Sequence, residues 1–353
     1  MKNLIKLLQK NELFKEIVRH LLTGKDCSVN GLWGSSASFF TATIVKERLK
    51  TRNVSPKILL VVSNIEEAEE DMNDLNTFLN GRTGLFPACE NIFSQSFEDE
   101  GDIHAQRLNI LNQTLHSNIQ TGNNLDIIVA PIQALLQSVP SPKSISKNIL
   151  NIRRNHEYPR EELIAWLQNH HYQQTCEVEH SGEYALRGGI IDIFPYASDV
   201  PYRIEYFGDE IESIRTFNIE SQLSEQDMDT CQILSVDEIH STNTIHTEFE
   251  KSSLIDYLSK DTWIFLKDHA RIEDRANKIL NNITNNGTLF TYNEIIRQFI
   301  PFVKITLSTL PLTSNNGDFT FHVKSADNFP QNIQAIVSEL GRVIESNTST
   351  VVF

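Results

Sequence analysis

Residues 31–38, GLWGSSAS, have the layout of a phosphate-binding loop, because an apolar stretch precedes them and a helical pattern follows. The N–H groups and the dipole at a helix N-terminus attract a phosphate at such a junction. A working loop, GxxxxGK[ST], also uses a second glycine for close backbone approach, a lysine for the outer phosphates and a hydroxyl for magnesium. Here Gly31 and Ser38 keep the first glycine and the hydroxyl, whereas Ser36 and Ala37 replace the second glycine and the lysine.

The missing lysine is the cation that offsets triphosphate charge, so we expect no phosphoryl transfer at this segment. Two interpretations stay open. The segment is a degenerate phosphate loop, in which Gly34 and the backbone are what is left of an anion site, or it is an ordinary strand–turn–helix junction.

Residues 233–240, ILSVDEIH, resemble the strand and DExH box with which helicases hold magnesium and activate water. Such a box works together with the phosphate-loop lysine, and this chain has Ala37 at that position. Short acidic sequences after a strand are also common. We therefore expect no helicase site at this segment.

Potential metal ligands follow one another in one short region, at His170, His171, Cys176 and His180. Their irregular spacing across an expected helix end and strand matches no standard ligand pattern, so we expect no metal site. The four cysteines of the chain are far apart and form no CxxC pair. This usage indicates reduced thiols and a cytoplasmic protein.

The overall composition is that of a soluble globular protein, with 40% hydrophobic and 22% charged residues over 353 positions, enough for two or three domains. The apolar runs are strand-length and far short of a membrane span. A formal net charge of −15 disfavours a surface built to grip nucleic acid, since neutralising phosphates needs clustered Lys and Arg. The balance favours a protein partner and no membrane association.

Short apolar strands alternate with helical segments in the first part of the chain, and these elements must position the loop. Strands are expected at 28–33, 57–63 and 126–130, and helices at 38–49, 65–79, 103–115 and 132–138. Strands that are apolar on both faces and alternate with helices are typical of a parallel sheet covered by helices.

The pattern changes after residue 140. We expect a strand at 143–152, a short helix at 159–169 and several strands with tight turns between 172 and 217, as in an antiparallel sheet. Beyond about residue 242, strands are expected at 262–266 and 302–307, and helices at 272–280, 292–299 and 332–345. The sequence stops inside an apolar strand, 350–353, so we expect it to be a fragment of a longer protein.

A two-residue hairpin turn is expected at Gly208 and Asp209, between two strands of alternating polarity. Alternate residues of a strand point the same way. One face should therefore be buried and carry Ile204, Tyr206 and Ile211, while the open face should carry Arg203, Glu205 and Glu212.

Taken together, these segments resemble the N-terminal, UvrB-like region of the bacterial transcription-repair coupling factors, the Mfd family. The strongest match is HSGEYALRGGIIDIFPYASDVPYRIEYFGDEIESIRTFNIESQLS, residues 180–224, which follows the family signature almost throughout. Residues 86–111, 126–142 and 158–173 give supporting matches in the expected order. The resemblance is clear over residues 31–224 and weak over 243–353.

Two departures separate this sequence from UvrB itself. Where UvrB has a working phosphate loop, this chain has Ala37. Where UvrB has a long tyrosine-rich hairpin that clamps DNA, the stretch 86–98 is short and has no aromatic cluster of that kind. Both absences match the coupling factors.

The resemblance implies an inactive UvrB-like module that recruits UvrA to stalled RNA polymerase. It implies no catalysis and no cofactor in this chain, because ATP, magnesium, DNA and RNA polymerase would be bound by other domains of the parent protein. A C-terminal domain of the parent would cover the docking face until the motor engages. The rival hypothesis is an ATP-binding, damaged-DNA-binding enzyme of the UvrB type, against which Ala37 and the missing hairpin argue.

Three residues match the UvrA-facing positions of the family, namely Arg187, Arg203 and Glu205. A fourth position, often Arg in relatives, falls on Gln173 or Gln174. Arginine beside glutamate on an open sheet face suits a polar protein interface, in which charges give orientation and specificity. The alternative is a solvated sheet face, and Arg215 and Asp192 are expected to be structural.

The expected fold is therefore α/β, a degenerate P-loop, helicase-like parallel-sheet domain with a smaller inserted α+β domain that has an antiparallel sheet, as in UvrB. Residues 1–142 and 241–325 would form the first domain and 143–240 the UvrA-binding insertion. Residues 326–353 would begin a further domain.

Overall fold

The computed structural model describes residues 2–49, 57–79, 82–89, 101–115, 125–234, 251–282, 289–310, 318–321 and 323. Several predicted features lie outside these residues. They are most of the stretch 86–98, the acidic residues 237–240, the helix at 332–345 and the whole segment 326–353 with its strand at 350–353.

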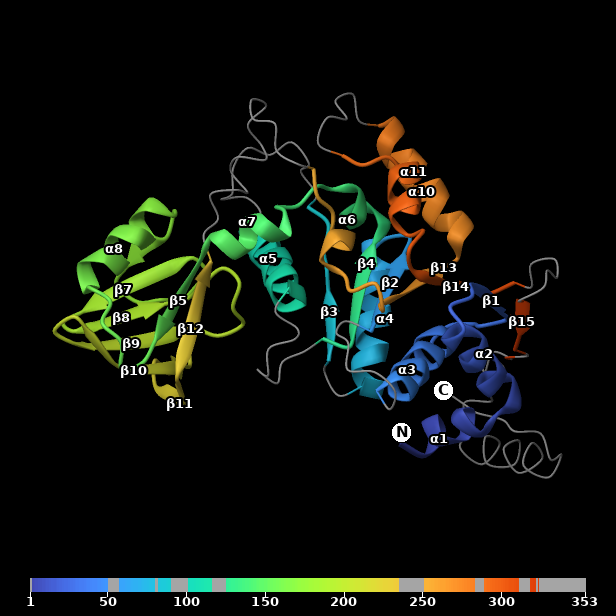
Figure 1. The fold of residues 1–353 in the computed structure, drawn as a ribbon, viewed down its shortest axis with the longest axis horizontal. Helices are drawn as coiled ribbons and strands as arrows, with labels where there is room; N and C mark the ends of the chain where they lie inside the picture. The colour runs from blue at the N-terminus through green and yellow to red at the C-terminus, as the bar shows by residue number, and fades with distance from the viewer. Residues whose placement is uncertain are drawn as a thin grey trace, which may run out of the picture.

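A parallel sheet of seven strands forms the larger part of the described chain, in the order β15-β1-β14-β13-β2-β4-β3 (Figure 1). Its strands are β1 (Cys27–Asn30), β2 (Ile58–Val62), β3 (Thr83–Leu85), β4 (Ile127–Pro131), β13 (Trp263–Lys267), β14 (Val303–Ser308) and β15 (Asp318–Thr320). All neighbouring pairs run parallel. β2 and β4 are buried along their whole length because their sequences are apolar on both faces. The predicted parallel sheet is thus confirmed.

Helices cover both faces of this sheet, and alternate residues of each central strand enter two separate cores (Figure 1). One face is covered by α1 (Lys2–Lys10), α2 (Glu12–Leu22), α3 (Ser36–Arg48) and α4 (Ile65–Leu79). The other is covered by α5 (Gly101–Leu115), α6 (Ile132–Leu136), the 3-10 turn η2 (Leu254–Tyr257), α10 (His269–Asn281) and α11 (Tyr292–Gln298). Within β2, Leu60 belongs to the first core and Leu59 to the second.

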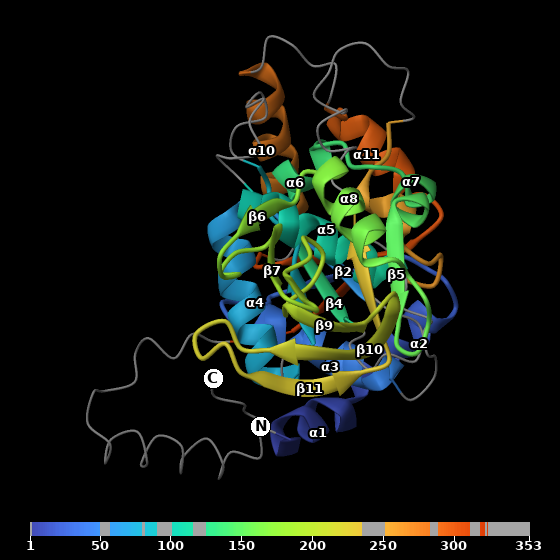
Figure 2. The same cartoon turned by 90° about the vertical axis from the view of Figure 1, so that its left-hand side faces the viewer.

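A second, mainly antiparallel sheet has the order β11-β10-β9-β8-β7-β6. Its strands are β6 (Gln173–Thr175), β7 (Glu183–Arg187), β8 (Ile190–Ile193), β9 (Tyr202–Phe207), β10 (Glu210–Phe217) and β11 (Ser224–Met228). Only the short edge strand β6 runs parallel to its neighbour. The helix α8 (Arg160–Asn169) packs on one face of this sheet, and Figure 2 shows both in front of the parallel sheet.

A two-stranded ribbon of β5 (Ile149–Arg153) and β12 (Thr230–Leu234) lies between the two sheets (Figure 1). The strand predicted at 143–152 was wrong in its first half, where the helix α7 (Pro142–Lys147) forms instead. The Ser141 side chain caps this helix by accepting from the Ser144 backbone N–H, and Pro142 at the first position favours a helical start. β12, the strand before the DExH-like residues, pairs with β5 and lies outside the parallel sheet.

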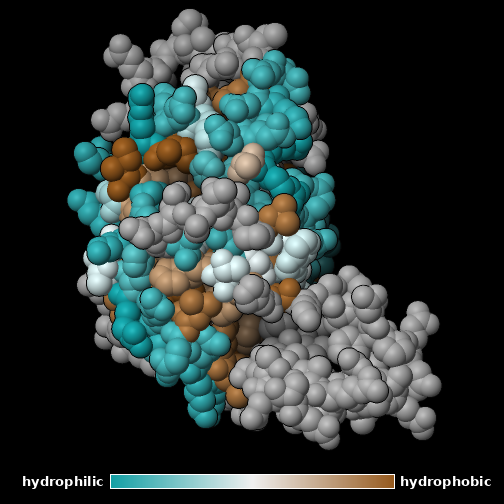
Figure 3. All heavy atoms as spheres, turned by 90° about the vertical axis from the view of Figure 1, so that its right-hand side faces the viewer, coloured by the Kyte–Doolittle hydropathy of each residue, from teal (hydrophilic) through white to brown (hydrophobic). Residues whose placement is uncertain are grey.

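The far end of the molecule, away from the second sheet, has a largely hydrophilic surface with separate apolar patches (Figure 3). None of the helices in the described parts of the chain could span a membrane. All four cysteines are free thiols, of which Cys27, Cys89 and Cys231 are buried and Cys176 is exposed.

Candidate functional site

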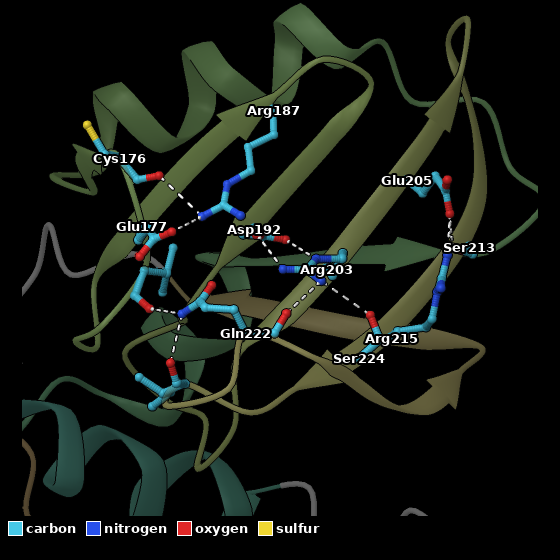
Figure 4. Close-up of polar contacts among 12 residues, drawn as sticks. Cys176, Glu177, Arg187, Asp192, Arg203, Glu205, Ser213, Arg215, Gln222 and Ser224 are labelled. Atoms are coloured by element: carbon cyan, nitrogen blue, oxygen red, sulfur yellow. Dashed lines mark hydrogen bonds and ion pairs between the residues drawn. The ribbon is translucent and has the colours of Figure 1, made fainter.

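The second sheet has one buried face and one open face, as its alternating sequence predicts. Ile204, Tyr206 and Ile211 are buried in the core that they share with α8, which confirms their predicted face. On the other face Arg187 is exposed, while Arg203 and Glu205 are half-buried. The structure therefore brings the three predicted docking residues onto the same side of the sheet, Arg187 from β7 and the other two from β9, with β8 between them (Figure 4).

Arg203 on β9 lies directly opposite Asp192 on β8 and binds its carboxylate with two hydrogen bonds. Nε donates to Oδ1 at 2.7 Å and Nη2 donates to Oδ2 at 2.9 Å (Figure 4). The third nitrogen, Nη1, donates to the Gln222 carbonyl at 3.1 Å. Hydrogen bonding to Asp192 raises the pKa of Arg203. Because Asp192 is only 1% exposed, this pair is a structural anchor of the face, as predicted for Asp192.

Glu205 accepts hydrogen bonds from two groups of β10. Its Oε2 accepts from Ser213 Oγ at 3.0 Å and from Arg215 Nη2, which also forms an ion pair with it (Figure 4). A shift of register between Ile211 and Ser213 places Ser213 opposite Glu205. The prediction assumed simple alternation beyond the turn and placed Glu212 on the face of Glu205. Because of the bulge, Ser213 is the residue that lies opposite Glu205.

Arg187, at the end of β7, is the most exposed of the three predicted residues, with 39% of its side chain accessible. Its Nη2 donates to Glu177 Oε1 at 3.1 Å and to the Cys176 carbonyl at 3.5 Å (Figure 4). An exposed pair of this kind is weak, since water and salt screen it. These two contacts therefore hold the guanidinium only weakly.

Phe207 is an exposed aromatic residue of this face that sequence analysis did not single out. It shares the face of Arg203 and Glu205 by alternation along β9, and it is 79% exposed. Aromatic residues, phenylalanine among them, are enriched at protein interfaces relative to the rest of the surface. The signal was present in the sequence, because positions 203, 205 and 207 alternate toward one side.

Two tight turns end the strands beside Phe207. The predicted hairpin turn at Gly208 and Asp209 is confirmed, with a positive φ of 63° at Gly208 that favours glycine. The neighbouring turn between β7 and β8 contains Gly188, with φ 60°, and Gly189, whose carbonyl accepts from the Tyr206 N–H at 2.9 Å. These turns fix the edge of the open face.

Gln173 and Gln174, on the edge strand β6, are exposed.

The phosphate-loop-like residues form a turn between β1 and α3. Gly31 has φ 79°, and a side chain there would meet the Phe321 carbonyl oxygen, 2.0 Å from an added Cβ. Gly34 also has a positive φ, 52°. The helix begins at Ser36, whose Oγ donates to the Trp33 carbonyl at 2.6 Å, and Ala37 is buried in its first turn. The junction has the predicted strand–turn–helix form, and both interpretations of the segment agree with it.

Ser38 does not face solvent, because its hydroxyl is held inside the fold. Ser38 Oγ donates to Asp71 Oδ1 at 2.6 Å, and Asp71 on α4 is in turn bound by Lys267 from the end of β13. Both Ser38 and Asp71 are buried. The hydroxyl that would hold magnesium in a working loop is thus committed to a carboxylate of this chain.

The candidate metal ligands do not gather into a site. His170 stacks on Trp166 with ring centroids 4.0 Å apart, and its Nδ1 bonds to the Trp166 carbonyl. His171 lies in the left-handed region at φ 63°. Among the described residues, no group of three or more His, Cys, Asp or Glu side chains is placed to hold a metal ion.

The family of the UvrB interaction domain matches residues 150–238, which span β5 to β12 and the second sheet between them. This match defines the class of the second sheet and its surroundings.

The similar proteins carry the name transcription-repair-coupling factor. The factor of Bacillus subtilis is 32% identical over 226 residues, covering 64% of this chain and 18% of its own length. That of Escherichia coli is 27% identical over 207 residues, covering 59% and 17%, and one from Staphylococcus aureus is 25% identical over 273 residues, covering 76% and 22%. The resemblance to the transcription-repair coupling factors is thereby confirmed. The chain spans about a fifth of the length of the relatives it matches.

Proposed function

We propose that this chain is a non-catalytic docking module that recruits UvrA in transcription-coupled nucleotide excision repair. The match of residues 150–238 to the UvrB interaction domain and the similarity to transcription-repair-coupling factors support this proposal. The docking surface is the open face of the second sheet, defined by Arg187, Arg203, Glu205 and Phe207.

The observation that carries the proposal is the exposed Phe207 on the same face as the exposed Arg187. Aromatic and arginine side chains supply most of the binding energy at protein interfaces, especially where they become fully desolvated. Phe207 offers apolar area that is not used within the described chain, and Arg187 offers a guanidinium held by one exposed glutamate and one backbone carbonyl. A partner with an apolar pocket beside a carboxylate would complement both.

The other two residues act differently, because they are already paired. Arg203 stays bound to Asp192 and Glu205 to Arg215, so their remaining hydrogen-bonding capacity faces the partner from fixed positions. Fixed charges of this kind orient a complex and exclude wrong partners more than they add affinity. We therefore assign anchoring to Arg187 and Phe207, and orientation to Arg203 and Glu205.

The wider role follows from the relatives. We infer a longer, cytoplasmic parent protein whose other domains bind ATP, magnesium, DNA and RNA polymerase and drive translocation along DNA. In that parent, a C-terminal domain covers the docking face until the motor engages. This chain itself contributes no nucleotide chemistry. Two features support this: Ala37 is buried and carries no charge, and the Ser38 hydroxyl is already hydrogen-bonded to Asp71.

Binding of purified UvrA to immobilised chain tests the proposal. Arg187→Ala and Phe207→Ala should each weaken binding by about tenfold or more, the loss typical of an interface anchor. Arg153→Ala, which removes an exposed arginine from the β5–β12 ribbon, is the matched control and should bind as the original chain does. Unchanged binding in both anchor variants would place the docking face elsewhere. Magnesium-dependent ATP binding at micromolar concentration would contradict the absence of nucleotide chemistry.

A further inference from the structure

The thiol of Cys89 lies beside an imidazole ring. Cys89 Sγ and His104 Nδ1 are 3.8 Å apart, a distance at which a thiol can donate a hydrogen bond to a ring nitrogen. Cys89 follows the strand β3 closely, and His104 belongs to the first half of α5. A base this close to a thiol can take its proton and leave a thiolate, which is the reactive form of cysteine.

Several hydrogen bonds fix the backbone around this pair. The Cys89 N–H donates to Gln137 Oε1 at 3.0 Å, and the Cys89 carbonyl accepts from Gln137 Nε2 at 2.7 Å. Arg107, one turn after His104 on α5, donates to the Pro87 carbonyl at 2.6 Å and to Gln137 Oε1 at 3.1 Å. The fold therefore holds the thiol and the imidazole together and brings a permanent positive charge to the same segment. A nearby cation favours a thiolate over a thiol.

Cys27 is a thiol of nearly equal exposure with opposite surroundings. Cys27 is 7% exposed and Cys89 is 8% exposed, so solvent reaches both to a similar extent. Burial and the carboxylates of Asp26 and Asp318 raise the pKa of Cys27 to about 12, which keeps it in the unreactive thiol form at neutral pH. Burial does the same for Cys231, whose pKa is also raised to about 12. The imidazole, and not the exposure, therefore distinguishes Cys89 from these two thiols.

We propose that Cys89 is a site of reversible thiolation by small disulfides, with His104 as its base. The Cys89 sulfur attacks one sulfur of the disulfide, so that a new S–S bond forms, the old S–S bond breaks and the other half leaves as a thiolate. The Cys89 proton passes to His104 Nδ1 and from there to the departing thiolate. The disulfide is the oxidant, and excess thiol reverses the reaction. The inference is independent of UvrA docking.

The test treats the folded chain with bis(2-hydroxyethyl) disulfide at neutral pH and follows each cysteine by mass spectrometry of its peptide. Cys89 should be modified at least about tenfold faster than Cys27, the internal control of matched exposure, and excess thiol should remove the added group. Cys176 is exposed and gives the rate of an ordinary accessible thiol. Modification of Cys89 no faster than that of Cys27 overturns the proposal.

The variant His104→Gln tests the base. It should slow the modification of Cys89 by about tenfold and leave the rate at Cys176 unchanged. His156→Gln, which removes an exposed histidine from the second sheet's surroundings, is the matched control and should change neither rate. An unchanged Cys89 rate in folded His104→Gln contradicts the role of the imidazole.

A second measurement uses the original chain alone and decides the matter if His104→Gln does not fold. Between pH 8 and pH 6 the rate at Cys176 should fall about tenfold per pH unit, as the thiolate of an ordinary cysteine disappears. The rate at Cys89 should fall less steeply, because His104 accepts its proton. Parallel falls at the two cysteines would overturn the proposal.

Discussion

The guanidinium of Arg203 forms two parallel hydrogen bonds to the carboxylate of Asp192, at 2.7 and 2.9 Å, across the neighbouring strands β9 and β8. The carboxylate is almost fully buried, and Arg203 is its ion-pair partner. Removing one member of such a pair leaves the other charge buried without compensation, which is more damaging than the pair is stabilising. Arg203 therefore has a structural role in addition to any contact with a partner.

Arg203→Ala should lower the free energy of unfolding by about 3 kcal/mol, because Asp192 would keep its charge without a counter-ion. Urea unfolding of both single variants and of Arg203→Ala/Asp192→Ala measures the pair directly. The double variant should be at least about 1 kcal/mol more stable than the sum of the single losses predicts. Additive losses would show that the two side chains do not act as a pair. Because Arg203→Ala is expected to be less stable, a loss of UvrA binding in this variant counts as loss of a contact only if the variant is folded under the binding conditions.

The second pair of the face, between Glu205 and Arg215, is about one-third exposed on both sides. Exposed pairs contribute little, so Glu205→Gln should change the free energy of unfolding by less than about 1 kcal/mol. The glutamine can still accept from Ser213, whose Oγ lies 3.0 Å from Glu205 Oε2. Urea unfolding of Glu205→Gln, measured in parallel with Arg203→Ala, compares the two losses of stability. A loss as large as that of Arg203→Ala would show that the pair is structural, and Glu205→Gln would then be unsuitable as a binding variant.

The sequence allowed good prediction wherever local pattern decides the outcome. The helix over residues 65–79 has the predicted bounds because acidic residues fill its first turn and apolar residues recur at helical spacing. The hairpin turn at Gly208 was predictable for the same reason, since a glycine and an aspartate interrupt two alternating strands. In contrast, α7 replaced the first half of the strand predicted at 143–152, because Ser141 caps a helix there and Pro142 starts it.

Contacts between distant elements could not be predicted in the same way. The pairing of Arg203 with Asp192 depends on the register of β8 against β9, and the bulge before Ser213 shifts the register of the next strand. The bonds from Ser38 and Lys267 to Asp71 join residues 33 and 196 positions apart. Packing of α3 and α4 on the same face of the sheet brings Ser38 to Asp71, and the end of β13 brings Lys267 to it.

Gly182, in the turn before β7, should not tolerate a side chain. Its φ is 88°, and an added Cβ would lie 2.3 Å from the Tyr196 ring. Tyr196 is buried and donates its hydroxyl to the His171 carbonyl at 3.0 Å, so the ring cannot easily move away. Gly182→Ala should lower the free energy of unfolding by roughly 2–4 kcal/mol, from backbone strain and overpacking together.

Gly24→Ala is the control for that substitution. Gly24 has a similar φ of 79°, but an added Cβ there meets no atom within 4 Å. Gly24→Ala should lower the free energy of unfolding by about 1 kcal/mol, from backbone strain alone. Urea unfolding of the two variants isolates the overlap with Tyr196 as their difference. Equal losses would show that the Tyr196 ring moves aside freely.

Alkaline pH should destabilise the chain through buried thiols and phenols. Burial raises the pKa of Cys231 from its ordinary 9.0 to about 12, and burial raises the pKa of Tyr196 from 10.0 to about 12. Both groups are neutral when protonated, so the folded chain holds its protons more tightly than the unfolded chain does. Stability from these groups is fully present below the unfolded pKa values and is lost as pH rises toward 12.

Cys231→Ala tests the contribution of one such group. Between pH 9 and about 12 the original chain should lose roughly 1 kcal/mol of stability per pH unit from Cys231, in addition to the losses from the tyrosines. The variant should be less stable at neutral pH, because Cys231 packs in the core beside β5 and a cavity remains. Its stability should nevertheless fall less steeply above pH 9. Urea unfolding at several pH values measures both slopes, and parallel slopes would mean that Cys231 does not titrate differently in the folded state.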